Sequence, residues 1–260
     1  MKKITEEHRK ELHNAMLILE NPSIAAKVTN IIGKPIEFGL NKLPENWNSK
    51  IGEVTQVALL KATDAAIFTM KDIPNDESSN WWHKIGVAVS GGVGGFFGLP
   101  ALAIELPIST TIMLRSIADI ARAQGESIND NETKLACLEV FALGGESTAD
   151  DATESGYFVI RTALANSVTA AVKLIGTKEG TSALTRFIVK IAERFSIQVT
   201  EKAVAQAAPA IGAAGGAIIN TIFIDHFQDM AKGHFTIRKL EKLYGKEDIK
   251  YLYEEMRKSK

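Results

Sequence analysis

The sequence predicts an all-α protein, and three observations support that class. Apolar residues recur at spacings of three and four along most of the chain, as on one face of a helix. No stretch alternates apolar and polar residues as a half-buried strand would. Breaks rich in Gly, Pro and Asn divide the chain into pieces of helical length. With 260 residues, 45% of them hydrophobic and 23% charged, the chain is expected to fold around a sizeable core.

Helices are expected at regular intervals from the first residues to the last. Asn21-Pro22 ends the first helix, Gly125 caps the C-terminus of another, and Asn129 or Asp130 caps the start of the next. We expect N-terminal helices over residues 1–48 and one helical domain over 49–258. The expected helices cover residues 4–20, 22–34, 50–71, 115–124, 131–143, 157–175, 182–206, 225–245 and 246–258.

Two long apolar segments stand out, at residues 81–114 and 203–224. Glu105 is the only charge between residues 85 and 114, and the second segment has none. Each is long enough to span a bilayer, for which a helix needs roughly 20 residues. Both are nevertheless rich in small residues, and Glu105, Pro100 and Pro107 interrupt the first.

Small residues allow helices to approach closely, at Gly91 and Gly95 in the first segment and at Gly212 and Gly216 in the second. The segments are therefore interpreted as two glycine-rich central helices packed together in a compact multi-helix domain. The alternative is an apolar hairpin that inserts into a membrane or lies on it.

Several functional classes are not supported. GGVGGFFG lacks the Gly-Lys-Ser/Thr ending of a phosphate-binding loop, and no Gly-x-Ser-x-Gly elbow is present. The net charge of -1 argues against a nucleic-acid partner. Cys137 is the only cysteine, which excludes a disulfide framework. The charged N-terminal helix does not resemble a signal peptide, so a cytoplasmic location is expected.

The first set of polar candidates borders the first apolar segment. Arg115, Asp119 and Arg122 share one helix face because they are four and three residues apart. If Pro107 begins this helix, Glu105 lies near its N-terminus, where the helix dipole favours a carboxylate. Glu105 is interpreted as a cap or as a buried ion-pair partner of an Arg.

The second set borders the second apolar segment and consists of Asn220, Asp225, His226, Asp229 and His234. His and Asp at spacings of three, four and eight on a helix suit a hydrogen-bond network, a metal-free ligand or catalytic pocket, or a metal site. No metal-binding signature such as His-Glu-x-x-His is present. All three interpretations remain open at this stage.

Both sets lie in stretches that resemble a known protein family. GLPALAIELPISTTIMLRSIADIARAQGE is similar to the central motif of the EcsC protein family, and GAAGGAIINTIFIDHFQDMAKGHFTIRKLEKLYG to its C-terminal motif. The resemblance covers about residues 50–250 and makes 49–258 an EcsC-like domain. The position of Glu105 carries Asp as well as Glu in the family. The resemblance implies a bacterial helical protein of undefined activity, associated with membranes or lipid, with an ABC transporter as gene neighbour.

Together these observations favour a binding protein over an enzyme, one that binds lipid, a membrane surface or another apolar ligand through the two segments. The expected location is cytoplasmic, at the inner face of the membrane. Alternatives are an adaptor for an ABC transporter and a hydrolase, with or without a divalent metal; no other cofactor is predicted. Candidate ligand-binding residues are Glu105, Arg115, Asp119, Asn220, Asp225, His226 and His234. Catalytic candidates are Glu105, His226 and Asp229, and metal candidates are His226, Asp229 and His234.

Overall fold

The computed structural model describes residues 4–20, 27, 29–30, 46–67, 99–144, 156–174, 180–207 and 212–259. Within these residues there are eight α-helices and no strand, so the predicted all-α class is confirmed. The helices are α1 (Glu6–Leu19), α4 (Trp47–Ala62), α6 (Leu99–Ala123), α7 (Asn131–Glu139), α8 (Gly156–Leu174), α9 (Gly180–Ala207), α10 (Gly212–Tyr244) and α11 (Lys246–Lys258). A π-helical turn (Thr63–Ile67) follows α4, and a 3-10 turn (Val140–Ala142) follows α7.

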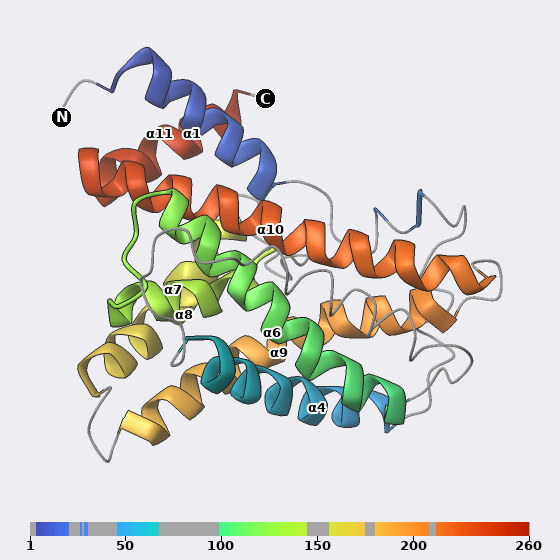
Figure 1. Cartoon of the computed structure of the whole chain (residues 1–260). Helices are drawn as coiled ribbons and strands as arrows, with labels where there is room; N and C mark the ends of the chain where they lie inside the picture. Colours follow the sequence, from blue (N-terminus) through green and yellow to red (C-terminus); the bar gives the residue numbers. More distant parts are fainter. Residues whose placement is uncertain are drawn as a thin grey trace.

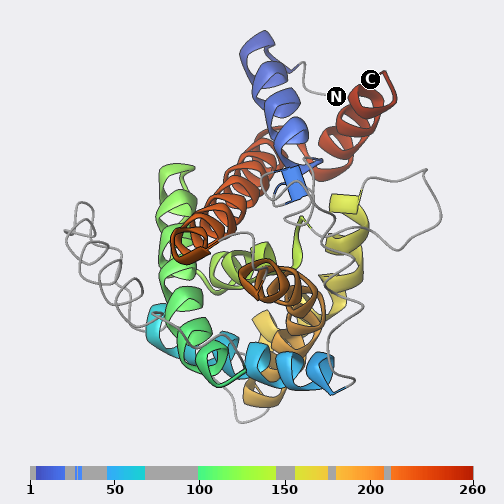
Figure 2. The same ribbon diagram turned by 90° about the vertical axis from the view of Figure 1, so that its right-hand side faces the viewer.

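The long helix α10 organises the molecule (Figure 1). Its length of 33 residues corresponds to about 50 Å, and it packs on α6, α9, α1 and α11. Helix α4 packs across α6 and α9 beneath it, while α7 and α8 complete the other side (Figure 2). Buried aromatic rings fill the space between α9, α10 and the turn after α7. The Phe141 and Phe195 rings lie 4.9 Å apart and the Phe223 and Phe227 rings 5.1 Å apart.

The N-terminal helix α1 is fastened to the C-terminal half of α10. Thr5 begins α1 by accepting a hydrogen bond from the His8 backbone N–H at 3.2 Å. The two helices meet at Gly233, where an added Cβ would lie 2.7 Å from Leu19 Cγ and 3.3 Å from the Ala15 carbonyl oxygen. The absence of a side chain at Gly233 therefore permits this close contact. The division of the chain at residues 48 and 49 stays a prediction.

Helix α6 differs from its expected form. The helix expected over residues 115–124 is longer: it begins at Leu99 and contains Pro107 in its interior, so the condition that Pro107 begins the helix is not met. Proline there leaves the carbonyl four residues earlier without its helical donor. That carbonyl belongs to Ala103, which is exposed, so water can replace the lost N–H. Apolar side chains before and after Pro107, such as Leu102 and Met113, are buried and favour the continuous helix.

The second apolar segment also differs, because it is divided between two helices. Residues 203–207 end α9 and residues 212–224 begin α10. The described parts of both apolar segments lie toward one side of the molecule, at the right of Figure 1, where α6 and α10 begin and α9 ends. Helices α6 and α10 pack together. Gly91, Gly95 and the GGVGGFFG run lie outside the described residues, as does most of the helix expected over 22–34.

Candidate functional site

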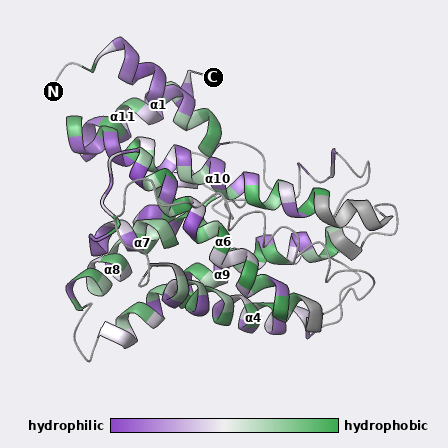
Figure 3. Ribbon diagram, viewed as in Figure 1, coloured by the Kyte–Doolittle hydropathy of each residue, from purple (hydrophilic) through white to green (hydrophobic). Residues whose placement is uncertain are grey.

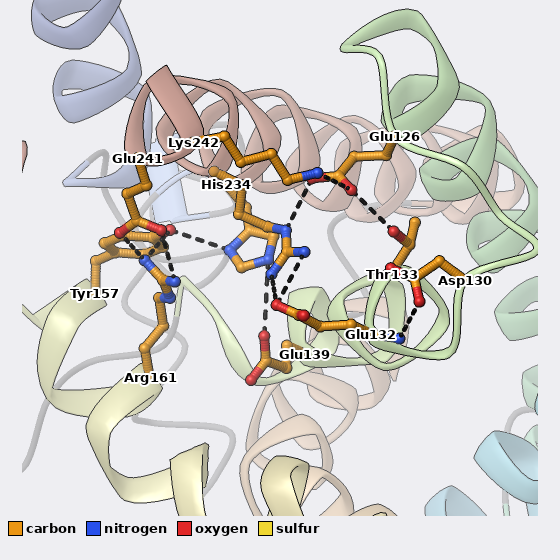
Figure 4. A network of polar contacts seen from close by, with 11 residues as sticks. Glu126, Asp130, Glu132, Thr133, Glu139, Tyr157, Arg161, His234, Glu241 and Lys242 are labelled. Carbon is orange, nitrogen blue, oxygen red and sulfur yellow. Dashed lines mark hydrogen bonds and ion pairs between the residues drawn. The ribbon is translucent and has the colours of Figure 1, made fainter. Parts of the chain in front are cut away.

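A buried group of charged and polar side chains lies where α7, α8 and α10 meet (Figure 4). We call it the polar cluster. It consists of two groups of five side chains, each linked by hydrogen bonds and ion pairs, that lie side by side (Figure 4). Its members are Glu126, Glu132, Thr133, Glu139, Tyr157, Arg161, His234, Arg238, Glu241 and Lys242.

The loop between α6 and α7 places the first carboxylate of the cluster. Gly125 adopts a φ of 84° after α6, in the left-handed region that favours glycine. The Asp130 side chain caps α7 by accepting a hydrogen bond from the Glu132 N–H at 3.4 Å, in agreement with the predicted cap. This geometry directs Glu126 toward α10 and lets the Thr133 hydroxyl donate to it at 2.8 Å.

Glu126 joins this loop to α10 through two cations. Arg238 Nε donates to Glu126 Oε1 at 3.1 Å and Lys242 Nζ to Oε2 at 2.7 Å. Burial opposes ionisation of Glu126, but the hydrogen bond from Lys242 and the charge of Arg238 outweigh it and lower the pKa of this carboxyl. Glu126 is therefore a charged link between the α6–α7 loop and α10.

On the α8 side, Arg161 binds Glu241 in a bidentate ion pair. The two nitrogen–oxygen distances are 2.7 and 3.0 Å. Arg161 also donates to the Tyr157 hydroxyl at 3.3 Å, and that hydroxyl lies 3.1 Å from His234 Nδ1. The fully buried His234 is thus held between charged groups without a charged partner in hydrogen-bond contact.

Glu139, at the end of α7, is the unusual member of the cluster. Its Oε2 lies 3.8 Å from His234 Nε2, which makes no hydrogen bond within the described residues. Burial raises the pKa of Glu139 to about 7, against the opposing charges of Arg161 and Arg238. Burial, aided by the same two arginines, lowers the pKa of His234 well below its usual value. A neutral imidazole therefore faces a carboxyl that titrates near neutral pH.

His226 occupies a separate site below the turn that follows α7. Gly144 lies against it with a φ of 79°, and a Cβ there would overlap the imidazole. Neither ring nitrogen of His226 makes a well-formed hydrogen bond within the described residues. Burial and the charge of Lys27 lower its pKa to about 3, although the Leu143 backbone partly opposes this. Gln198 Nε2 donates to the Leu143 carbonyl at 2.7 Å and fastens this turn to α9.

Glu105 has a partner that spacing alone did not reveal. Its Oε1 lies 2.7 Å from Lys202 Nζ of α9, and the lysine side chain is only 1% exposed. The ammonium also lies 4.7 Å from the centre of the Phe223 ring of α10. An arginine was the expected ion-pair partner, but the partner is a buried lysine 97 residues later in the sequence.

The remaining predicted residues lie apart from these sites. Arg115 donates to the Ala65 carbonyl at 3.2 Å, while Asp119 pairs with Arg122 at 3.1 Å, as their spacing indicated. The other three residues of the second set take no part in either buried site: Asp229 pairs with Lys232, Asn220 is half-buried and Asp225 is exposed.

The candidate residues do not gather into one centre. No hydrogen bond or ion pair among the described residues joins Glu105, His226, Asp229 and His234 to one another. His226 and His234 are about 12 Å apart along α10, because each residue of a helix advances 1.5 Å. Within the described part of the chain, no three His, Cys, Asp or Glu side chains could hold a metal ion together.

Sequence reasoning did not identify Glu139, Tyr157, Arg161, Arg238 and Glu241. One signal was available: Glu139 interrupts the apolar run LACLEVFAL, and a carboxylate within a buried run needs partners. A second was the spacing of His234, Arg238 and Glu241, which places all three on one face of α10.

Comparison with known proteins adds one finding. The family model described as the EcsC protein family matches residues 2–240 of the chain. Searches of curated proteins and of solved structures give no significant match.

Proposed function

The chain belongs to the EcsC protein family, and we propose that it binds the surface of a lipid bilayer through the side of the molecule where its two apolar segments lie. One observation carries this proposal. The first turns of α6 and α10 and the last turn of α9 lie on the same side of the molecule, at the right of Figure 1, although α6 begins about 100 residues before α10. Lys202 of α9 connects the two segments, because it contacts both Glu105 of α6 and the Phe223 ring of α10. We call this region the apolar end. Large apolar side chains are exposed within three turns of it: Ile104, Ile108, Ile197 and Ile218.

Exposure of large side chains at the apolar end is substantial. Ile104 is 71% exposed and Ile108, one turn later on α6, is 41% exposed. Ile218, two turns into α10, is 47% exposed. Burying one such side chain in an apolar phase contributes about 1.5–3 kcal/mol, so a few of them suffice for reversible membrane binding.

The ion pair at Glu105 supports this orientation. An unpaired carboxylate between Ile104 and Ile108 would oppose contact with hydrocarbon by a few kcal/mol. The contact with Lys202, at 2.7 Å, leaves the pair with no net charge. The apolar end can then approach lipid without carrying an isolated charge toward it.

Binding at the surface fits the helices better than crossing the bilayer. None of the helices among the described residues is both long and apolar enough to cross a membrane. Hydrophilic residues concentrate at the opposite end, on α1, α11 and the last turns of α10 (Figure 3). A protein with one apolar and one polar end is suited to lie with the apolar end in the interfacial region and the polar end in water.

Vesicle flotation of the purified protein tests the proposal. We expect the wild-type protein to float with vesicles of neutral phosphatidylcholine and with vesicles containing anionic phosphatidylglycerol. Ile104→Asp should reduce the floating fraction several-fold. Tyr251→Asp is the matched control, because Tyr251 is 65% exposed on α11 at the polar end.

Two results would overturn it. One is wild-type protein that remains at the bottom of the gradient with both vesicle types, including the case in which it carries a co-purifying lipid in an internal pocket. The other is an equal loss of flotation in Ile104→Asp and Tyr251→Asp. The adaptor alternative rests on the family resemblance alone, and the hydrolase alternative rests on residues that the structure keeps apart.

A further inference from the structure

Three side chains from three helices lie in a row inside the polar cluster (Figure 4). His234 of α10 is in the middle. Its Nδ1 is 3.1 Å from the hydroxyl of Tyr157 on α8, and its Nε2 is 3.8 Å from Oε2 of Glu139 on α7. All three side chains are at most 9% exposed. Each ring nitrogen therefore faces one group that can give or take a proton.

The neighbours of Tyr157 determine one arrangement of the hydrogens. Arg161 donates to the Tyr157 oxygen at 3.3 Å, so the hydroxyl hydrogen is free to point at His234 Nδ1. A neutral His234 then carries its proton on Nε2, directed at Glu139. This arrangement suits an ionised Glu139, which only accepts hydrogen bonds.

A protonated Glu139 requires the opposite arrangement. Its O–H needs an acceptor. His234 Nε2 lies next to Glu139, is buried and makes no hydrogen bond within the described residues, so it can be that acceptor. We propose that Glu139, His234 and Tyr157 form a proton-linked switch in which protonation of Glu139 moves the His234 proton from Nε2 to Nδ1 and turns the Tyr157 hydroxyl from donor to acceptor. The cluster gains one proton from solvent: an O–H bond forms on Glu139, an N–H bond is exchanged within the imidazole, and His234 stays neutral.

The charged groups around Glu139 place the transition in the physiological range. Arg161 of α8 and Arg238 of α10 favour its ionised form, while Glu132 of α7 and Glu241 of α10 oppose it. Burial is the largest effect and raises the pKa to about 7.

The other charged groups nearby are engaged elsewhere. Glu126 and Lys242 bind each other, and Glu126 also binds Arg238. From α9, Arg194 donates to the Ala142 carbonyl at 3.0 Å.

The switch is connected to the polar end of the molecule. The Tyr157 ring stacks on that of Tyr253 in α11, with centres 6.0 Å apart, and the Tyr253 hydroxyl donates to Glu20 at the end of α1 at 2.7 Å. Rotation of the Tyr157 hydroxyl therefore changes the polar surroundings of the contact between α8 and α11.

The sign of the pH effect follows from the raised pKa. A carboxyl that binds its proton more tightly when folded stabilises the fold below its usual pKa of 4.5, and this contribution is lost as pH rises through about 7. Between pH 5 and 9 the folding equilibrium constant of the wild type should fall about 100-fold relative to that of Glu139→Gln, which keeps the shape and cannot ionise.

NMR of protein labelled with ¹⁵N-histidine tests the proton transfer directly. In the wild type, the Nδ1 and Nε2 shifts of His234 should exchange character between pH 5.5 and 8.5, with a midpoint near 7. In Glu139→Gln, which cannot ionise, they should keep a single pattern at every pH. Tyr157→Phe removes the hydroxyl oxygen that would accept a hydrogen bond from Nδ1–H. In this variant His234 should keep its proton on Nε2, while the pH dependence of stability should still show the titration of Glu139.

The His234 signal is assigned by its loss in His234→Gln or, if that variant does not fold, by its selective shift in Tyr157→Phe. Parallel stability profiles for the wild type and Glu139→Gln would overturn the proposal. So would His234 shifts that do not move with pH, or that exchange unchanged in Tyr157→Phe.

Discussion

Substitution of Gly144 by alanine is the most informative perturbation of the core. Gly144 has a φ of 79°, and a residue with a Cβ costs about 1–2 kcal/mol in that region. The new Cβ would also overlap the His226 ring and lie 2.9 Å from Met230 Sδ. Both side chains are fully buried, so neither can move into solvent. Overpacking of this kind adds about 1–3 kcal/mol, and we expect a total loss of about 2–5 kcal/mol.

Gly125 provides the matched control for this substitution. Its φ of 84° is nearly the same, but an added Cβ would meet nothing within 4 Å. Gly125→Ala should therefore lower the free energy of unfolding only by the cost of a Cβ in this backbone conformation, about 1–2 kcal/mol. Urea unfolding followed by circular dichroism measures both variants against the wild type.

A double-mutant cycle separates the steric effect from any other cause. In a His226→Ala background the ring is absent and only the contact with the flexible end of Met230 remains, so the cost of Gly144→Ala should fall close to that of Gly125→Ala. Equal losses for Gly144→Ala and Gly125→Ala in the wild-type background would refute the reasoning. A cost of Gly144→Ala that does not change when His226 is removed would refute it as well.

Three further predictions concern buried charge. Glu105→Gln leaves Lys202 buried without a counter-ion and should cost about 3 kcal/mol in urea unfolding, most of which the double variant with Lys202→Met should recover. Arg161→Lys keeps the charge but loses the two-pronged contact with Glu241, so thermal unfolding should show a loss of about 1–2 kcal/mol that Arg186→Lys, at an exposed site, does not. His226 and His234 have lowered pKa values, so their stabilisation is present above pH 6.5 and lost as pH falls. In a Glu139→Gln background the stability should fall with decreasing pH between pH 6 and 4, by at most about 1.4 kcal/mol per pH unit for each histidine, and His226→Gln should reduce that slope.

The helices were predictable where local chemistry alone determines them. Helix α11 extends over Lys246–Lys258, the range expected, because Gly245 precedes it and its apolar residues recur at spacings of three and four. Asp130 caps α7 through a bond to a residue two positions away. Such interactions lie within a few residues, so the sequence contains all of their participants.

The partners of buried charges were not predictable from one sequence. The spacing of Arg115, Asp119 and Arg122 indicated a shared face, and Asp119 does pair with Arg122. The same reasoning could not associate Glu105 with Lys202, because periodicity shows which face is buried but not which helix covers it. The extension of α6 through Pro107 was not predictable for a related reason: burial on both sides of Pro107 overrides its local tendency to interrupt a helix.

Helix α10 is in contact with a different part of the molecule at nearly every turn. Phe223 meets Lys202 of α9, His226 lies below Gly144, His234 meets Tyr157 of α8, and Glu241 binds Arg161. Insertion of one residue after Phe223 would rotate all later side chains by about 100° and shift them by 1.5 Å, so the contacts of His226, His234 and Glu241 would be lost together. Natural variation in chain length should therefore be excluded from α10 and confined to the connections around it, however freely its exposed positions accept substitution.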